Sequence, residues 1–381
     1  MKIVTIIGAR PQIIKAAAIS RAISNHFSEE IEEHIVHTGQ HYDDNMSDVF
    51  FSELGIPEPD INLNVGSGMH GKQTAAMTEG IEKVLVDIKP DYLVLYGDTN
   101  STLAGAVAAS KLLIPIVHIE AGLRSFNKTM PEEINRIVCD HCSALLFSPT
   151  PAGIRNLEKE GFPTKGKMPH NSDNPGVFHC GDVMYDNSLH FAGLAEEQSK
   201  ILERLNLRNK RFVLATIHRN QNTDNAARLQ FLFNALAATA VREKINIVLP
   251  LHPRTQKMLE QNNITIKEEA KNMLQIVPPV SFLDMIMLEK HSSLVMTDSG
   301  GVQKEAFYFE KPAIILRPET EWIEIVEHGT AALAAETESE LINQASEYLN
   351  NPPTDFPEIF GDGKASVFIC KTMLENHRSK N

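Results

Sequence analysis

The sequence has few cysteines, a single tryptophan and no excess of positive charge. Its 381 residues include 4 cysteines and 1 tryptophan, and the formal net charge at pH 7 is −13. Four cysteines are too few for a disulfide scaffold, and a nucleic-acid surface would need a net basic face. No apolar run approaches the roughly 18 residues that a membrane-spanning helix requires. We therefore expect a chain of the reducing cytoplasm with no nucleic-acid and no membrane partner.

Several familiar signals are also missing from the start of the chain and from its glycine-rich segments. The first residues, MKIVTIIGARP, contain one lysine and only a short apolar run, so we expect no signal peptide. The turn after the first predicted strand lacks the G-x-G-x-x-G spacing of a dinucleotide site. Residues 66–73 fit that spacing and nearly fit a phosphate loop, but Gln73 stands where Ser or Thr must bind magnesium. We interpret this segment as a flexible loop that leads into a helix from about Thr74.

The sequence offers no convincing metal site. Cys139 and Cys142 form a C-x-x-C pair inside a predicted helix, and no second pair of ligands accompanies them. His37 and His41 are four residues apart, but Gly39 lies between them and the glutamate of a metal-binding helix is missing. We predict two small buried thiols, no metal and no cofactor.

The length and the pattern of the chain predict two α/β domains. A chain of 381 residues exceeds what one hydrophobic core usually holds. Short apolar runs alternate with helical segments in both halves, which indicates Rossmann-like domains with parallel sheets. We place the first domain at residues 1–186 and the second at 187–363, and a C-terminal helix at about 364–381 could pack back on the first.

The strongest signal runs from Tyr92 to Arg136. Two apolar runs, Tyr92–Tyr96 and Ile116–Ile119, flank an alanine-rich helical segment and predict a βαβ unit. Asp98 follows the first run and Glu120 follows the second. Because ligands bind beyond the carboxyl ends of parallel strands, both carboxylates should face one crevice. The alternative is that they only cap helices or bind loop amides.

More acids and cations follow in the same stretch. Glu132 and Glu133 open the next helix behind Pro131, and Arg124 and Arg136 stand beside the acids. Such a crevice would offer both proton carriers and donors for an anion.

Two further turns have the features of anion sites. Near the start, Arg10 and Lys15 lie at the beginning of a predicted helix, whose exposed amides can bind a phosphate. In the second half, Asp298-Ser299-Gly300-Gly301 joins a strand to a helix, so backbone amides could approach a diphosphate closely. Glu305, one turn into that helix, could accept from ribose hydroxyls. The glycine pair has the alternative reading of tight packing alone.

The acids lie in the first half and the predicted diphosphate turn in the second, so we expect a substrate in a cleft between the domains. Without a nicotinamide fingerprint or a metal cluster, the remaining chemistry is proton transfer near a nucleotide diphosphate leaving group. Such a site needs a base, an acid and cations on the departing phosphate. Arg10, Lys15, His218 and the glycine turn could supply the positive groups.

A set of motifs, in this order along the chain, resembles a known family. These motifs are Gly8-Ala9-Arg10-Pro11-Gln12, Gly97-Asp98-Thr99, Glu120-Ala121-Gly122-Leu123-Arg124, Pro131-Glu132-Glu133-Ile134-Asn135-Arg136, His218-Arg219, Thr297-Asp298-Ser299-Gly300-Gly301 and Gly361-Asp362-Gly363. Together they span nearly the whole chain and resemble the non-hydrolysing UDP-N-acetylglucosamine 2-epimerases. The resemblance implies a glycosyltransferase-B-like fold. It also implies elimination of UDP to a glycal, re-addition with inverted C2, and a cytoplasmic homodimer.

The resemblance assigns roles to individual residues. Asp98, Glu120 and Glu132 would be the acid/base residues, supported by Lys15, Arg136 and His218. The substrate-binding residues would be Arg10, Lys15, Phe282, Met285, Ser299, Gly300, Gly301, Glu305 and Arg317. A second, activating UDP-sugar would be bound in some bacterial members at the positions of Gln40, His41, Gln73 and His252.

The sequence departs from the family pattern at three places. The usual HRREN is His218-Arg219-Asn220-Gln221-Asn222, the usual Thr-Glu-Arg is Thr320-Glu321-Trp322, and an expected aromatic residue is Met285. These changes resemble the branch that acts on UDP-2,3-diacetamido-glucuronate. UDP-N-acetylglucosamine and that uronate therefore both stay open as substrates. The competing activities are a hydrolysing 2-epimerase, a glycosyltransferase of the same fold and a non-catalytic nucleotide-sugar binding module.

Overall fold

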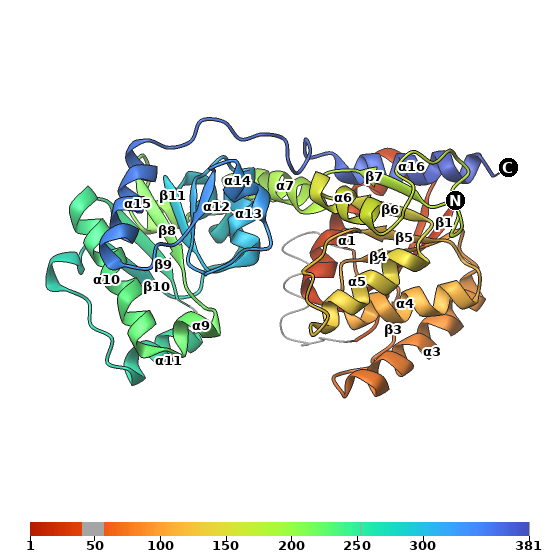
Figure 1. Ribbon diagram of the computed structural model, residues 1–381, viewed down its shortest axis with the longest axis horizontal. Helices are drawn as coiled ribbons and strands as arrows, with labels where there is room; N and C mark the ends of the chain where they lie inside the picture. The colour runs from red at the N-terminus through yellow and green to blue at the C-terminus, as the bar shows by residue number, and fades with distance from the viewer. Residues whose placement is uncertain (40–56, 252, 381) are drawn as a thin grey trace. The chain divides into compact units, whose positions relative to one another are not determined.

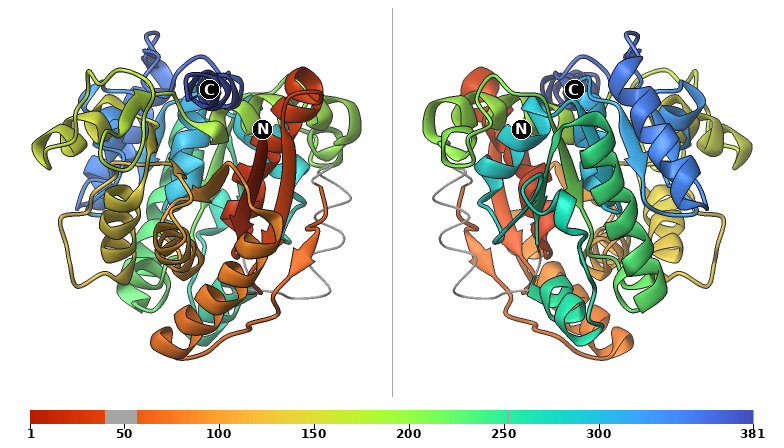
Figure 2. Two further views of the ribbon diagram at one scale, coloured as in Figure 1. Left: turned by 90° about the vertical axis from the view of Figure 1, so that its right-hand side faces the viewer. Right: turned by 90° about the vertical axis from the view of Figure 1, so that its left-hand side faces the viewer.

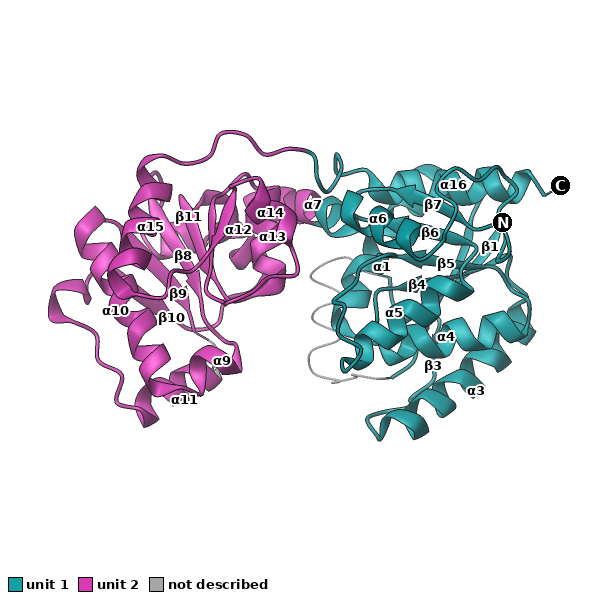
Figure 3. Cartoon of the chain, viewed as in Figure 1, with its two compact units in different colours: residues 1–187, 358–381 teal, residues 188–357 magenta. Residues whose placement is uncertain are grey.

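The computed structural model describes residues 1–39, 57–251 and 253–380, which form two compact units (Figure 3). Unit 1 comprises residues 1–187 and 358–381, and unit 2 comprises residues 188–357. Helix α7 (Val183–Gln198) contains the boundary between them. The chain therefore passes from unit 1 to unit 2 and later returns.

Unit 1 is built on a seven-stranded parallel sheet with the order β3-β2-β1-β4-β5-β6-β7 (Figure 1). The strands are β1 (Lys2–Ile7), β2 (Glu32–His37), β3 (Ile61–Asn62), β4 (Tyr92–Tyr96), β5 (Ile116–Ile119), β6 (Leu145–Ser148) and β7 (Gly176–His179). The strand order reverses between β1 and β4, which is the position where doubly wound folds bind ligands. All five residues of β4 are buried, as expected for a strand covered on both faces.

Helices cover both faces of this sheet. The helices of unit 1 are α1 (Arg10–Ala22) with its continuation η1 (Ile23–Phe27), α3 (His70–Ile88), α4 (Asn100–Lys111), α5 (Pro131–Cys142), α6 (Pro151–Lys159) and α16 (Ala365–Arg378). Helices α3, α4 and α5 pack in sequence on one face, and α1 packs with α16 on the other (Figures 1 and 2). Buried Leu93 and Leu95 of β4 meet Met77 and Ile81 of α3 in the core on the first face.

Unit 2 repeats the same plan with six parallel strands in the order β10-β9-β8-β11-β12-β13. The strands are β8 (Phe212–Thr216), β9 (Asn246–Pro250), β10 (Leu274–Val277), β11 (Leu294–Thr297), β12 (Ala313–Ile315) and β13 (Ala331–Leu333). The helices are α8 (Ile201–Arg204), α9 (Asn220–Thr223), α10 (Ala226–Glu243), α11 (Pro253–Gln261), η2 (Glu268–Ala270), α12 (Phe282–His291), α13 (Gly300–Tyr308), α14 (Ile323–Glu327) and α15 (Glu338–Asn350). Its switch point lies between β8 and β11.

The C-terminal helix α16 is part of unit 1. Asp186 accepts hydrogen bonds from the backbone nitrogens of Ala365 (3.0 Å) and Ser366 (2.8 Å), the first residues of α16. Near the other end, buried Asn376 donates to the Tyr92 hydroxyl at 2.8 Å. The helix is thus attached at both ends to elements that precede residue 188.

Some elements differ from those expected from the sequence. Helix α3 begins at His70 rather than at about Thr74, and the Gln73 nitrogen donates to the Met69 carbonyl as in a first helical turn. Strand β13 was not predicted, because Ala331-Ala332-Leu333 contains no β-branched residue. Helix α15 was not predicted either. Within the described residues, no helix is long and apolar enough to cross a membrane.

Candidate active site

In unit 1, Gln12 and Gly8 fix the turn after β1 at the switch point between β1 and β4. Gln12 accepts from the Gly8 and Ala9 nitrogens at 2.9 and 3.2 Å and donates to the Tyr96 carbonyl at 2.9 Å. A Cβ atom on Gly8 would lie 2.1 Å from the Ser101 hydroxyl. The turn after β1 is therefore fixed against the end of β4, and it sets the position of Arg10, the exposed first residue of α1.

Glu120 and Lys15 form a largely buried ion pair at this edge. The exposed fractions of the two side chains are 8% and 14%. Burial alone would lower the pKa of Lys15, but the Glu120 carboxylate, with Asp182 and Asp98, raises it above its usual value. Glu120 has a φ of 72°, a left-handed conformation that is uncommon outside glycine. The ammonium group is therefore charged at neutral pH and lies directly beside a carboxylate.

Asp98 lies beside the same pair and is bound by Arg136 of α5. A Cβ atom on the neighbouring Gly97 would lie 3.2 Å from Glu120 Oε2 and 3.6 Å from Lys15 Nζ, so the β4 and β5 turns meet. The cap of α4 is Thr99, whose hydroxyl accepts from Thr102 N at 3.4 Å. Asp98 is therefore not the helix cap of the alternative reading.

The two adjacent glutamates of α5 have different surroundings. Glu133 is 1% exposed, and its carboxylate accepts from the Ser125 and Phe126 nitrogens at 2.9 Å each and from Arg136 at 2.9 Å. Glu132 is exposed. It precedes Arg136 by four residues, which places both on one face of the helix. Glu132 thus faces the same side as the cation that binds Asp98.

The expectation that Arg124 offers donors for an anion is wrong. Its guanidinium is 1% exposed and forms ion pairs with Asp140 and Glu160, both at 2.7 Å. Asp140 also contacts His118 of β5, with 2.6 Å between Oδ1 and Nδ1. Sequence reasoning missed this buried group because its members are far apart along the chain.

In unit 2, Asp298 connects the two strands at the switch point. Its buried carboxylate accepts from the backbone nitrogens of His218 and Arg219, each at 3.0 Å, and from Asn222 Nδ2 at 2.9 Å, and it lies 3.0 Å from His218 Nδ1. Burial alone would raise the pKa of Asp298, but these donors hold it below its usual range. His218 is thereby oriented by a carboxylate while its side chain remains 42% exposed.

The glycine pair that follows is not required by packing. Ser299 is the cap of α13, with its hydroxyl accepting from Val302 N at 3.4 Å. A Cβ atom on Gly300 would lie no closer than 3.7 Å to its neighbours, and one on Gly301 no closer than 3.8 Å. Both distances are ordinary contacts, and neither glycine has a positive φ. The tight-packing alternative is therefore not supported among the described residues.

A tryptophan and several charges surround this turn. Trp322 Nε1 donates to the Gly300 carbonyl at 3.1 Å, and the Lys304 ammonium lies 4.1 Å from the centre of the Trp322 ring. Arg317 binds Glu321 through two hydrogen bonds of 2.9 and 3.1 Å. The guanidinium of Arg219 would lie 3.7 Å from a Cβ on Gly300. Lys304 and Arg219 were not predicted as site residues, although both stand within or next to motifs that were recognised.

The remaining predicted residues of unit 2 lie on two neighbouring helices. Phe282 begins α12, and its ring makes an edge contact with Phe191 at 5.2 Å between ring centres. Met285, one turn later, is half-buried. Glu305 lies on α13, with a carboxylate oxygen 3.8 Å from a Cβ on Gly301.

Of the four residues expected at an effector site, only Gln73 lies within the described residues. Its amide donates to the Gly66 carbonyl at 2.8 Å and accepts from Asn100 Nδ2 at 2.9 Å. Gln40, His41 and His252 lie outside the described residues.

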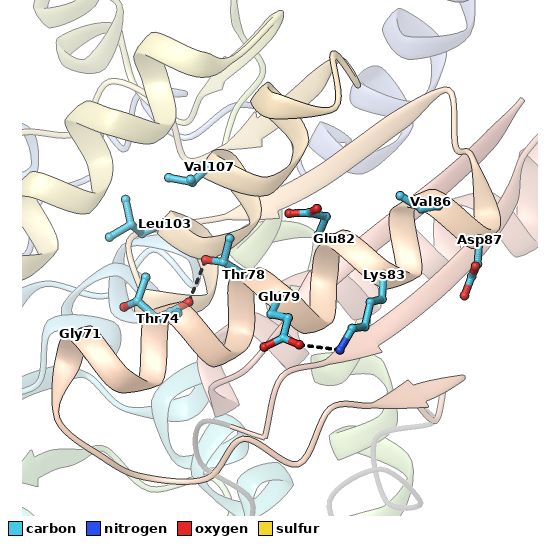
Figure 4. A pocket seen from close by; sticks show the side chains of 11 residues that line it. Gly71, Thr74, Thr78, Glu79, Glu82, Lys83, Val86, Asp87, Leu103 and Val107 are labelled. Carbon is cyan, nitrogen blue, oxygen red and sulfur yellow. Dashed lines mark hydrogen bonds and ion pairs between the residues drawn. The ribbon is translucent and has the colours of Figure 1, made fainter.

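An open groove of about 880 Å³ lies between α3 and α4 of unit 1 (Figure 4). Glu79, Glu82 and Asp87 line it together with Leu103 and Val107, and an ion pair of 2.6 Å joins Glu79 to Lys83. None of the predicted site residues lines this groove.

The chain is similar to other proteins over nearly its whole length. It is 46% identical over 375 residues to a UDP-N-acetylglucosamine 2-epimerase homolog of Methanococcus maripaludis, covering 98% of this chain and 99% of that one. It is 46% identical over 382 residues to a UDP-2,3-diacetamido-2,3-dideoxy-D-glucuronate 2-epimerase of Pseudomonas aeruginosa, covering 98% and 100%. The solved structure of UDP-GlcNAc 2-epimerase from Methanocaldococcus jannaschii matches with a TM-score of 0.85, 39% identity and coverage of 98% and 100%.

These likenesses confirm two predictions made from the sequence. The fold consists of two Rossmann-like domains with parallel sheets of the glycosyltransferase-B-like type, and the resemblance of the motifs reflects family membership. Residues 24–374 match the model of the family described as UDP-N-acetylglucosamine 2-epimerase. This chain therefore belongs to the UDP-N-acetylglucosamine 2-epimerase family.

Proposed function

We propose that the chain is an isomerase that inverts C2 of a UDP-2-acetamido sugar. The observation that carries this proposal is the cluster at the switch point of unit 1, where Asp98 and Glu120 lie beside the cations Lys15 and Arg136. A cluster of carboxylates with paired cations suits reversible proton transfer next to a departing phosphate. Family membership supports the same reaction.

The reaction would proceed in two steps, an elimination and a re-addition. A carboxylate removes the C2 proton while the C1–O bond breaks, so a C1=C2 double bond forms and UDP leaves with the bonding electron pair. UDP then attacks C1 again, and C2 receives a proton on the opposite face. Asp98, Glu120 and Glu132 are proposed as the proton carriers. Lys15, Arg136 and His218 would stabilise the negative charge on the leaving group.

Unit 2 would bind the diphosphate and the uridine. Ser299, Gly300 and Gly301 begin α13, and a helix N-terminus presents free amides to an anion. The space beside the two glycines supports close approach of a phosphate, because no described side chain would occupy the positions of the missing Cβ atoms. Arg10 and Arg317 would add positive charge.

The nucleoside would be held by the two helices next to this turn. Glu305 would bind the ribose hydroxyls, and Phe282 and Met285 would contact the uracil ring. In support, Glu305 lies within 3.8 Å of the position of a Cβ on Gly301, and Phe282 and Met285 stand one turn apart on α12.

UDP-N-acetylglucosamine, giving UDP-N-acetylmannosamine, is the first substrate we propose. UDP-2,3-diacetamido-glucuronate is the second, and the departure from the family pattern at Trp322 favours it. Sequence identity does not separate the two substrates, because the chain is 46% identical both to the UDP-N-acetylglucosamine 2-epimerase homolog of Methanococcus maripaludis and to the UDP-2,3-diacetamido-2,3-dideoxy-D-glucuronate 2-epimerase of Pseudomonas aeruginosa. Trp322, whose ring centre lies 4.1 Å from the Lys304 ammonium, stands where the resemblance to the family leads us to expect the arginine of Thr-Glu-Arg.

Proton NMR in heavy water with each UDP-sugar tests the proposal. Epimerisation predicts deuterium at C2 and the appearance of the C2 epimer, with UDP remaining attached to the sugar at equilibrium. Free N-acetylmannosamine would instead identify a hydrolysing enzyme. If neither sugar exchanges its C2 proton, the proposal is wrong and a glycosyltransferase or a binding module remains.

We further propose that the enzyme works in the cytoplasm as a homodimer. All four cysteines lie among the described residues as free thiols, which suits a reducing compartment. The dimer rests on the resemblance to the family. Sedimentation velocity of the purified chain, which should give about twice the monomer mass of 42.4 kDa, tests it.

A further inference from the structure

A buried histidine lies beneath the two turns that carry Asp98 and Glu120. His118 is in β5, two residues before Glu120, and it is 0% exposed. Its Nδ1 lies 2.6 Å from Asp140 Oδ1, and its Nε2 lies 2.8 Å from the Gly97 carbonyl oxygen. An ionised carboxylate and a carbonyl can only accept hydrogen bonds. Both ring nitrogens must therefore donate, which requires the imidazolium form.

The partner carboxylate reaches the second turn. Asp140 Oδ2 accepts from the Gly122 nitrogen at 3.1 Å and from Arg124 Nη1 at 2.7 Å. Burial alone would lower the pKa of His118, but Cys139 and Asp140 beside it raise the pKa well above its usual range. The His118 imidazolium, the Asp140 carboxylate and the Arg124 guanidinium thus form a buried row of alternating charge that begins at the Gly97 carbonyl.

The two turns have backbone conformations that need such support. Gly97 and Gly122 have φ values of 59° and 79°, and Glu120 has 72°. A left-handed conformation is uncommon for glutamate and persists only where the surrounding contacts determine it. The hydrogen bonds to Gly97 O and Gly122 N hold the residue before Asp98 and the second residue after Glu120.

We propose that His118, held as an imidazolium by Asp140, is a positioning residue that fixes the relative placement of Asp98 and Glu120. This inference rests on the function proposed above. His118 is buried under both turns and touches no bulk solvent, so it would act only through the two carboxylates. Loss of its charge should displace the carboxylates without altering the UDP-binding turn of unit 2.

The test compares His118→Gln with His170→Gln. His170 is another buried histidine of unit 1, 3% exposed, whose Nδ1 lies 3.2 Å from the Asn174 carbonyl and which is not connected to either acid turn. We expect His118→Gln to lower kcat about 100-fold, the effect of a misplacement of roughly 1 Å, with the Kd for UDP unchanged within a few-fold. His170→Gln should keep the wild-type kcat.

Two kinetic results would overturn the inference. One is a folded His118→Gln variant with wild-type turnover, and the other is an equal loss of turnover in His170→Gln. If the wild-type chain itself exchanges no C2 proton of either UDP-sugar, the proposed function fails instead.

Neutron diffraction of the deuterated wild-type chain tests whether both ring nitrogens of His118 are protonated. This test depends neither on activity nor on the folding of any variant. Deuterium on both ring nitrogens of His118 is expected. Deuterium on one nitrogen only would contradict the inference.

Discussion

At the scale of single residues, two adjacent glutamates have different roles: Glu132 is proposed for catalysis, and Glu133 stabilises the fold. Glu133 uses both carboxylate oxygens to bind the backbone of residues 125–126 and Arg136, whereas Glu132 is exposed at the start of α5. The sequence presents the two as equals behind Pro131. Only the fold shows that the carboxylate of Glu133 is bound by the surrounding protein and that Glu132 is exposed.

Glu132→Gln and Glu133→Gln should therefore fail in different ways. Glu132→Gln should lower kcat by roughly 100-fold or more and leave stability unchanged, because general acid–base catalysis contributes on that order. Glu133→Gln should lower the free energy of unfolding by about 1–3 kcal/mol, because a buried amide replaces an acceptor of three hydrogen bonds. Steady-state kinetics and urea denaturation measure the two effects. Wild-type turnover in folded Glu132→Gln would remove this glutamate from the mechanism.

His37 is a second residue whose charge state follows from its surroundings. It is 1% exposed, and its Nδ1 accepts from the Gly39 nitrogen at 2.9 Å, which requires that nitrogen to be unprotonated. Burial lowers the pKa of His37 from 6.5 to about 4. The native state therefore binds the proton less readily than the unfolded chain does.

The stability of unit 1 should consequently fall in mild acid. The contribution of neutral His37 is complete above pH 6.5 and is lost as the pH falls toward 4, to a total of about 3 kcal/mol. His37→Gln keeps an acceptor but does not titrate, so the variant should lose less stability over this range. Urea denaturation of both chains at several pH values between 7.5 and 4 checks this. Parallel curves for the two chains would contradict it.

At the scale of elements, two glycines at the switch points of the two sheets have different surroundings. Gly8 follows β1 in a space so narrow that a Cβ would lie 2.1 Å from Ser101 Oγ and 2.4 Å from Thr38 Oγ1. Gly301 follows β11, and a Cβ there would make only ordinary contacts, the nearest at 3.8 Å from Glu305 Oε2. Gly8 is therefore required for packing of the folded chain, whereas Gly301 would be required to leave room for a bound diphosphate.

Gly8→Ala and Gly301→Ala should thus separate folding from binding. Gly8→Ala should be strongly destabilised, by about 1–3 kcal/mol as in other overpacked sites. Gly301→Ala should keep or slightly raise its melting temperature, because alanine is the better helix former, while the Kd for UDP rises about tenfold or more. Differential scanning calorimetry and titration calorimetry provide the measurements. Unchanged UDP affinity in Gly301→Ala would argue against the diphosphate assignment.

Elements with a continuous apolar run were predicted within about a residue, since strands buried on both faces have a pattern that turns do not share. Strands β4 and β5 have the expected bounds, Tyr92–Tyr96 and Ile116–Ile119. The beginning of α3 was missed because its first turn, His70 to Gln73, carries no apolar periodicity. The His118–Asp140 pair could not be predicted, because 22 positions separate its members and their contact depends on how α5 packs against β5.

At the scale of the whole molecule, the attachment of α16 to unit 1 depends on a few buried polar contacts. Asp186 accepts from Ala365 N, Ser366 N and the Ser366 hydroxyl at 2.6–3.0 Å. Burial raises the pKa of this carboxyl group despite these donors. Ile369 and Met373 of the same helix are 0% exposed.

Asp186→Ala should loosen α16 and unit 1 but not unit 2. Two buried backbone donors lose their acceptor, which costs about 1–3 kcal/mol for each unsatisfied group. Hydrogen exchange followed by mass spectrometry should show faster exchange in α16 and β1 and unchanged exchange in β8. Asp362→Ala is the matched control, since this exposed carboxylate contacts only Lys364 among the described residues, through its backbone nitrogen at 3.1 Å and its ammonium group at 3.7 Å. Equal acceleration in both variants would show that Asp186 has no special part in the attachment.

The return of the chain to unit 1 also sets an order of assembly during synthesis. Unit 2 is one unbroken stretch, residues 188–357, so it has every residue it needs once position 357 has left the ribosome. Unit 1 begins to emerge first, yet its sheet face beside α1 stays uncovered until α16 has been translated. The younger half of the nascent chain can therefore mature before the older half, and the last helix acts as the closing piece for the part of the protein made earliest.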